Sequence, residues 1–199
     1  MNHLVVVSHP NEHSLTMGLA RAYAAELESL GHTVRMHDLY RGGFNPVLAA
    51  PELIPAGPDR PAGADVLQAQ EDIRQADVVT LVYPVWWSSM PAMLKGYVDR
   101  VFAFGFAYDI ENGLLRGKLS GKKVVLITVS GAPRPVLVED GTWDAMQLLT
   151  DNQLFAAVGC AVVEHLHFGG ILPGLPAAVA EQHLERVRAC ARQHGSTEA

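Results

Sequence analysis

Short apolar runs alternate with amphipathic segments along this chain. Apolar runs rich in β-branched residues are typical of strands buried on both faces of a sheet, and they cover residues 4–7, 78–83, 123–129 and 160–167. A more polar run over 32–39 predicts a weaker strand at a sheet edge. Amphipathic spacing predicts helices over 15–30, 66–75, 91–102, 143–158 and 177–193.

This alternation of five strands with five helices predicts an α/β fold with a parallel sheet and helices on both faces. No repeat or linker divides the chain, so we expect one domain over residues 1–199. The order alone leaves a flavodoxin-like sheet and a dinucleotide-binding sheet open, and both bind ligands at the carboxyl ends of the strands. Residues 41–64, rich in Gly, Pro and Ala, predict an irregular loop, either functional or a flexible excursion.

Composition narrows the class of protein. The 199 residues are 49% hydrophobic and 18% charged, which excludes a disordered chain. A net charge of −6 without a basic stretch argues against nucleic-acid binding. Two cysteines, Cys160 and Cys190, lack the spacing of a metal site, so we expect no metal. We see no signal peptide and no apolar run of membrane length, and therefore expect a cytoplasmic protein without membrane insertion.

The loop after the first strand, residues 8–16, is rich in small hydroxyl side chains where a helix begins. The free N–H groups of a helix N-terminus favour a phosphate, and Ser14 and Thr16 add hydroxyl donors. Neither GxGxxG nor GxxxxGK[ST] is present, so the common dinucleotide and P-loop motifs are absent. Two plainer interpretations stay open: Ser14 is only a helix N-cap, and His9 is a structural histidine bonded to the loop backbone.

Two further strand-end loops carry unusual residues. In residues 83–91 we expect one of Trp86 and Trp87 to pack inward and the other to form the wall of a pocket for a flat aromatic ligand. We also expect free backbone amides after Pro84; the alternative is that the tryptophan pair clamps the next helix. In residues 128–133, Gly131 permits close backbone approach to a ligand, although a plain turn would also explain it.

These residues resemble those of a known family, the NAD(P)H:quinone oxidoreductases. The similarity is carried by residues 84–102, by 105–108, by 5–10 with Ser14 and Leu15, and by 38–40 with 44–46. It runs from residue 3 to about residue 131. It implies a flavodoxin-like three-layer sandwich whose five-stranded parallel sheet has the order 2-1-3-4-5. It also implies a non-covalent flavin, FAD with FMN as the alternative, and a homodimer with its active site at the subunit interface.

The resemblance also implies roles for individual residues. The flavin phosphates would be surrounded by His9, Ser14, Leu15 and Thr16. The ribityl chain and ring edge would be followed by Pro84, Val85, Trp86, Trp87 and Ser88, and the other side of the ring would be closed by Thr128, Val129, Ser130 and Gly131. The substrate would meet Trp87, Ser130, Gly131 and Tyr108, the last from the partner subunit. We expect Phe106 and Tyr108 to be exposed on a partner surface.

The chain departs from the family after Thr128. Val129 and Ser130 replace a Thr and a Gly of the family's loop, and ungapped alignment places Val136 and Thr142 where DT-diaphorase has a Tyr–His relay. The relay is therefore missing, and no catalytic side chain is predicted. We expect backbone donors near Ser130 and Gly131 to stabilise the reduced ring. We interpret the later histidines, His165 and His167, as a structural pair; the alternative is that they substitute for the missing relay.

The implied activity is hydride transfer from NAD(P)H through bound flavin to a quinone or similar flat acceptor, in a ping-pong cycle. An alternative is a regulatory flavoprotein, a redox-sensing ancillary subunit that acts through a protein partner. A one-electron flavodoxin fits less well, because it would be more acidic and would lack the sequence of residues 84–102.

Overall fold

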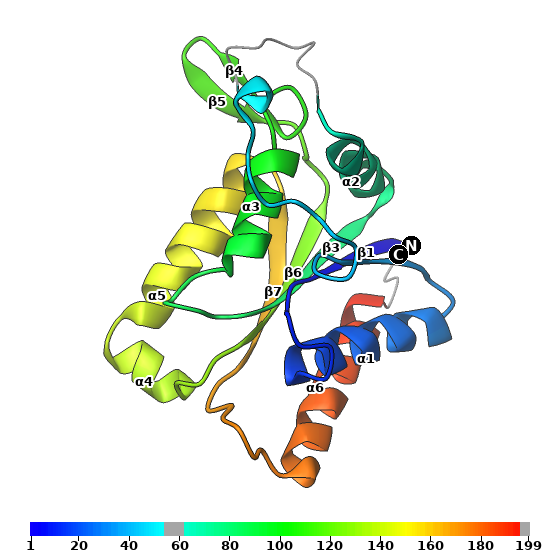
Figure 1. Cartoon of the computed structure of the whole chain (residues 1–199), viewed down its shortest axis with the longest axis vertical. Coiled ribbons are helices and arrows are strands. Elements are labelled where there is room, and N and C mark those ends of the chain that lie inside the picture. The colour runs from blue at the N-terminus through cyan, green and yellow to red at the C-terminus, as the bar shows by residue number, and fades with distance from the viewer. Residues whose placement is uncertain (54–61, 196–199) are drawn as a thin grey trace.

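Five parallel strands form the central sheet in the computed structural model, which describes residues 1–53 and 62–195. Their spatial order is β2-β1-β3-β6-β7, with every neighbouring pair parallel (Figure 1). The strands are β1 (Asn2–Val7), β2 (Thr33–Asp38), β3 (Val78–Pro84), β6 (Lys123–Val129) and β7 (Ala161–Phe168). Counted within the sheet this is the order 2-1-3-4-5, so the predicted topology is confirmed.

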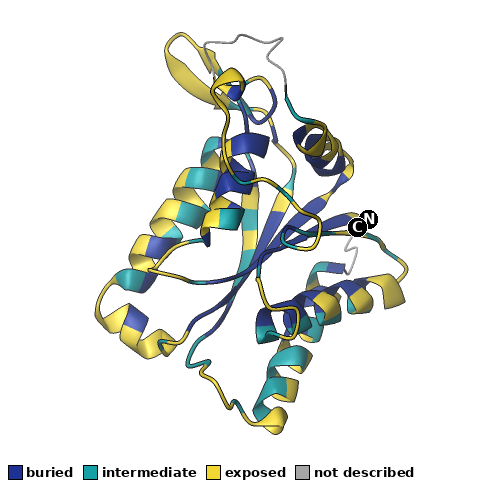
Figure 2. Ribbon diagram, viewed as in Figure 1, coloured by how far each residue is buried: buried dark blue, intermediate teal, exposed yellow. Residues whose placement is uncertain are grey.

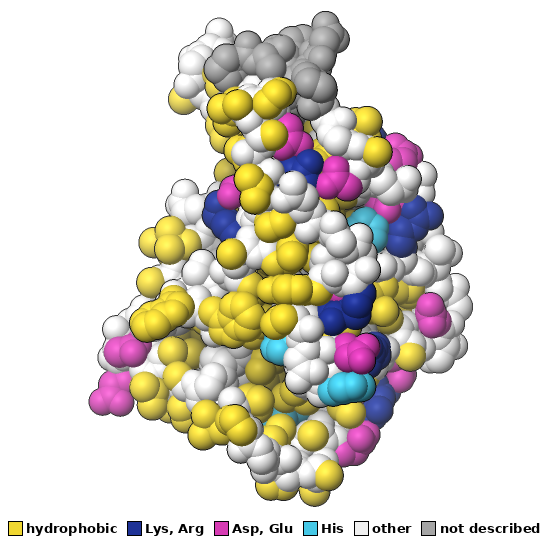
Figure 3. All heavy atoms as spheres, in the orientation of Figure 1, with side chains coloured by type: hydrophobic (Ala, Val, Ile, Leu, Met, Phe, Trp, Pro, Cys, Tyr) yellow, Lys and Arg dark blue, Asp and Glu magenta, His cyan; other side chains and the backbone are white. Residues whose placement is uncertain are grey.

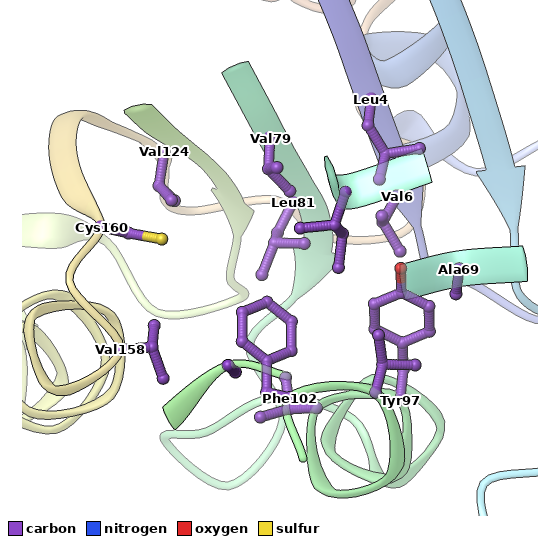
Figure 4. Close-up of a cluster of buried hydrophobic side chains, with 14 of the residues drawn as sticks. Leu4, Val6, Ala69, Val79, Leu81, Tyr97, Phe102, Val124, Val158 and Cys160 are labelled. Atoms are coloured by element: carbon purple, nitrogen blue, oxygen red, sulfur yellow. The ribbon is translucent and has the colours of Figure 1, made fainter. Parts of the chain in front are cut away.

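Helices cover both faces of this sheet. One face packs against α1 (Leu15–Ser29) and α6 (Ala177–Gly195), and the other against α2 (Ala64–Gln75), α3 (Ala92–Val101) and the π-type helix η3 (Gln147–Phe155). Figure 4 shows the second interface, where Phe102 points from the α3 region toward Leu81 of β3 and Tyr97 points toward Val6 of β1. The three-layer sandwich is therefore confirmed, with its central strands buried as Figure 2 shows.

The central strands are apolar throughout because alternate side chains enter different cores. In β1, Val6 joins the core under α2 and α3, whereas Val5 and Val7 join the core under α1 and α6. Fully burying one such aliphatic side chain stabilises the fold by about 1.5–3 kcal/mol. The edge strand β2 is only partly covered, which explains its more polar sequence.

A small hairpin was not predicted. It consists of β4 (Tyr108–Glu111) and β5 (Leu114–Gly117), which pair antiparallel. Its turn contains Asn112 and Gly113, both with positive φ (53° and 78°), as a tight two-residue hairpin turn requires. The Asn–Gly pair between apolar residues was the sequence signal for it.

The expected exposure of two aromatic residues near this hairpin is wrong. Phe106 is buried beneath Arg74, whose guanidinium lies 4.9 Å from its ring centroid, and Tyr108 is half-buried against Phe104. Both side chains pack into or against the core under α2 and α3. The exposed apolar residues of the hairpin are instead Ile110, Leu114 and Leu115.

The helix predicted over 143–158 is present, because α5 (Thr142–Met146) passes directly into η3. The separate helix before it, α4 (Arg134–Glu139), was not predicted. Gly141, with φ 77°, adopts the left-handed conformation that divides α4 from α5. The π-type turns of η3 continue the course of α5 without a break, so the apolar spacing alone could not distinguish the two helix types.

Part of the loop over 41–64 is firmly held. Arg100 of α3 donates from Nε to both Glu52 carboxylate oxygens (3.0 and 3.2 Å) and from Nη1 to Asp65 Oδ2 and the Asn45 carbonyl (2.6 Å each). Glu52 belongs to a single 3₁₀ turn, η1 (Ala50–Glu52). Glu52 and the Asn45 carbonyl are therefore held against the body of the domain, and residues 54–61 lie outside the described residues.

Both cysteines are buried, and neither forms a disulfide. Within residues 1–53 and 62–195, no helix combines the length and apolar character needed to cross a membrane. In those same ranges no cluster of three or more His, Cys, Asp or Glu is arranged to hold a metal ion.

Candidate functional site

A cavity of about 220 Å³ lies where the strand order reverses between β1 and β3, the position at which this type of sheet binds ligands. The loops after β1, β3 and β6 converge on it. It is lined by His9, Ser14, Leu15, Thr16, Pro84, Val85, Trp86, Val129, Ser130, Gly131 and Ile171. All but Ile171 were named from the sequence, whereas Trp87, Ser88 and Thr128 were named but do not line it.

A larger cavity, of about 410 Å³, lies at the end of the edge strand β2. It is bordered by residues 36–39, 42–44, Gln68 and Tyr97, among others. We assign the site to the smaller cavity because three central strands end there and the helix α1 begins there.

The first loop forms the N-cap of α1 and lies at the positive end of that helix. The Met17 N–H donates to Ser14 Oγ (3.3 Å), so Ser14 is the N-cap of α1. Other N–H groups of the first turn have no partner within the helix and lie at its positive end. Arg41 holds the loop by donating to the carbonyls of His9 (2.5 Å) and Pro10 (3.1 Å). Capping and phosphate binding are therefore compatible here.

His9 is hydrogen-bonded to the loop backbone, as the interpretation of it as a structural histidine predicts. His9 Nδ1 lies within hydrogen-bond distance of both the Asn11 N–H (3.0 Å) and the Asn11 carbonyl oxygen (3.1 Å). Burial, and secondarily the Arg41 charge, lower the pKa of His9 below its ordinary value. The ring lies edge-on to Trp86 at a centroid distance of 6.1 Å, and together they form one side of the cavity.

The two tryptophans of the second loop do not divide as predicted, because neither is buried. Trp86 and Ser89 exchange two backbone hydrogen bonds (3.0 and 3.1 Å) around a tight turn. Trp87 and Ser88 occupy the tip of that turn with positive φ (50° and 58°), so both point away from the cavity and the Trp87 side chain is 100% exposed. Figure 3 shows apolar side chains gathered over this connection between β3 and α3. Trp86, at 42% exposure, lines the cavity.

The expectation of free backbone amides is largely wrong. The Val85 amide donates to the Val129 carbonyl (2.7 Å), and the Ser130 amide donates to the Phe168 carbonyl (2.9 Å). These amides complete the sheet, so they are not available to a ligand. Gly131 keeps the expected open approach, because a Cβ built there would lie 3.6 Å from Leu172 Cδ2, an ordinary contact.

Thr128 lies beneath the cavity floor instead of lining it. Its buried hydroxyl bridges two histidines of β7, His165 Nε2 at 3.0 Å and His167 Nδ1 at 2.8 Å. His167 Nε2 lies 3.1 Å from Ser130 Oγ, and His165 Nδ1 lies 2.9 Å from an Asp151 carboxylate oxygen. Sequence reasoning named both histidines but missed Asp151, which the irregular helix η3 brings beside β7.

The two residues that align with the family's Tyr–His relay, Val136 and Thr142, do not line the cavity. Val136 is exposed on α4, and Thr142 begins α5. Tyr108 lies on the β4–β5 hairpin, at the opposite end of the molecule from the strand-end loops (Figure 1). Its predicted role toward a partner subunit stays a prediction.

Known proteins resemble this chain along most of its length. A family model described as a flavodoxin-like fold matches residues 1–191. An uncharacterized NAD(P)H oxidoreductase of Haemophilus influenzae is 38% identical over 175 residues, covering 86% of this chain and 85% of that protein. The mouse ribosyldihydronicotinamide dehydrogenase [quinone] is 30% identical over 154 residues, covering 69% of this chain and 67% of that protein. The structure of an NAD(P)H:quinone oxidoreductase from Methanothermobacter marburgensis superposes with a TM-score of 0.89 and 29% identity, covering 98% of each chain.

Proposed function

The chain belongs to the flavodoxin-like family shared by these NAD(P)H oxidoreductases, and on that premise we propose that it is a flavin-dependent NAD(P)H:quinone oxidoreductase. The observation that carries this proposal is the convergence of three strand-end loops on one cavity at the sheet reversal. Bound flavin, FAD or FMN, would accept a hydride from NAD(P)H and pass it to a flat acceptor.

The residues present suit a flavin. The first turn of α1, with the hydroxyls of Ser14 and Thr16, offers donors for a phosphate. Pro84, Val85 and Trp86 give an apolar wall for a flat ring, and Gly131 leaves room opposite them. Polar groups at one end and apolar groups along the sides match the two ends of a flavin nucleotide.

The cavity of one subunit is small. About 220 Å³ is less than the roughly 300–1,000 Å³ of most small-molecule sites, which supports a site whose wall a second subunit completes. The ping-pong cycle, in which donor and acceptor use the same place in turn, is proposed from the family resemblance. We propose a two-fold homodimer, in which the fully exposed Trp87 becomes covered and Tyr108 faces the partner's site.

Flavin affinity tests this function. Trp86→Ala should raise the dissociation constant for FAD or FMN at least tenfold, because it removes one wall of the cavity. Gln68→Ala is the matched control, since Gln68 borders only the larger cavity beside β2. Equal losses in both variants would contradict the assignment of the site. Tight flavin binding without turnover on NAD(P)H and a menadione-type quinone would instead favour the regulatory flavoprotein.

A further inference from the structure

A buried hydrogen-bonded chain runs from Asp151 through His165, Thr128 and His167 to Ser130 at the cavity. We propose that this chain holds one transferable proton and delivers it to the reduced acceptor through the Ser130 hydroxyl. The proposal rests on the proposed function for its destination, but the chain itself is defined by the contacts of this protein alone. It revises the interpretation of the two histidines as merely structural.

Counting protons shows why this hydrogen-bonded chain carries one transferable proton. It contains five hydrogen bonds, because Ser130 Oγ also lies 2.7 Å from the Ala132 carbonyl. Its two ends, the Asp151 carboxylate and the Ala132 carbonyl, can only accept. Two neutral histidines, one threonine and one serine bring four protons between them. The chain is therefore fully bonded only when it carries one proton more than its neutral side chains supply.

The charges around the chain place that proton at His165. Asp151, on η3, lies 2.9 Å from His165 Nδ1 and offers the opposite charge. Burial, followed by the charges of His165, Arg134 and Arg186, lowers the pKa of His167 to about 4, so His167 stays neutral. On the side of β3, burial and the Asp151 charge raise the pKa of Tyr83, which stays neutral as well.

One direction of donation follows from this placement. His165 Nδ1–H donates to Asp151, and His165 Nε2–H donates to Thr128 Oγ1. The Thr128 hydroxyl then donates to His167 Nδ1, and His167 Nε2–H donates to Ser130 Oγ. Every donor and acceptor along the chain is satisfied, as buried polar groups require.

Trp143 separates this chain from solvent. Its ring centroid lies 4.9 Å from that of His165 and 5.1 Å from that of His167, and Arg134 lies over it at 4.4 Å. Trp143 is only 4% exposed. Because Thr128 and the histidine side chains are buried as well, the member of the chain that meets the cavity is Ser130.

Reduction of a quinone to its hydroquinone takes up one hydride, which NAD(P)H supplies, and one proton. In the proposed step Ser130 Oγ–H turns from the Ala132 carbonyl and gives its proton to the acceptor oxygen. Ser130 Oγ takes the proton of His167 Nε2, His167 Nδ1 takes that of Thr128, and Thr128 takes that of His165 Nε2. His165 is left neutral, still donating to Asp151, and one proton that enters from the cavity at Ser130 and passes back along the same hydrogen bonds restores it. Ser130 is thus the catalytic residue, and the others are positioning residues.

The chain is tested first without any cofactor, by NMR of the whole protein labelled with ¹⁵N-histidine. Near pH 7 we expect protons on both ring nitrogens of His165 and on Nε2 alone of His167, with the signals assigned from His165→Gln and His167→Gln. Thr128→Val, which keeps the shape of the side chain but breaks the chain, should change both patterns. A His165 ring with a single proton in the unaltered protein would overturn the proposal.

The second test measures the pH profile and solvent isotope effect of acceptor reduction. Thr128→Val should slow acceptor reduction at least tenfold, because general acid catalysis typically contributes about that much or more to a rate. It should also abolish the solvent isotope effect of this step. Thr128→Ser, which keeps the hydroxyl, should restore the rate to within about threefold. Thr80→Val, a buried threonine of β3 outside the chain, controls for effects on folding and should leave the rate unchanged.

These outcomes separate the inference from the proposed function. A protein that shows the expected histidine protonation but takes up no flavin would contradict the function and leave the chain intact. The protein could instead turn over quinone while its Thr128→Val variant keeps an unaltered rate and isotope effect. That result would overturn the proposed proton transfer through the hydrogen-bonded chain and leave the proposed function intact.

Discussion

Gly131 offers a substitution that separates ligand binding from folding. Its φ lies outside the left-handed region, and a Cβ built there would meet Leu172 Cδ2 at 3.6 Å and the Ile171 carbonyl at 3.8 Å, both ordinary contacts. Gly131→Val therefore adds three carbon atoms at the cavity, and the first of them, Cβ, meets only ordinary contacts. We expect its free energy of unfolding to change by less than about 1 kcal/mol.

The same three atoms occupy space that a flavin ring requires. Forcing extra atoms into a packed site costs about 1–3 kcal/mol, so the flavin dissociation constant should rise by about 5- to 150-fold. Fluorescence titration with FAD and FMN measures this change, and denaturant unfolding of the flavin-free protein measures stability. Gly169→Ala is the contrasting case: its Cβ would lie 2.7 Å from the Arg134 amide nitrogen, so it should destabilise the fold. Unchanged flavin affinity in Gly131→Val would refute the proposed position of the ring.

Three other predictions concern stability and rate. Arg100→Met should lower stability by about 3–5 kcal/mol, seen as a lower denaturant midpoint at unchanged slope, because it removes the guanidinium from the buried Glu52. Burial lowers the pKa of His3 in the folded protein to about 4. As the pH drops, His3 is therefore protonated in the unfolded chain before it is protonated in the folded one. The free energy of unfolding should fall by as much as about 3 kcal/mol between pH 6.5 and pH 4. His3→Phe should remove that share of the loss, as thermal unfolding at several pH values would show. Thr142→Ala should change the rate of hydride transfer less than tenfold in stopped-flow measurements, since Thr142 does not line the cavity.

The sheet could be predicted because each central strand is apolar for a reason that the sequence carries. Strands such as β1 and β6 send alternate residues into two cores, which produces uninterrupted β-branched runs. The strand-end loops could be placed at one edge for the same reason, since parallel strands bring their carboxyl ends together. The family resemblance then named most of the residues that line the cavity.

What could not be predicted depends on local geometry that leaves little trace in the sequence. The turn at Trp87 directs that side chain into solvent, and only the positive φ of Trp87 and Ser88 reveals it. Asp151 reaches His165 because η3 follows a π-type course, which shifts its side chains from the positions of a regular helix. A pattern of apolar residues cannot report either effect.

The most direct test of the proposed activity follows the visible absorbance of purified protein loaded with flavin, under anaerobic conditions. We predict that one flavin binds per chain, that NAD(P)H bleaches its absorbance, and that a menadione-type quinone restores it in a separate step, as a ping-pong cycle requires. A colourless protein that takes up neither FAD nor FMN on reconstitution would contradict the account.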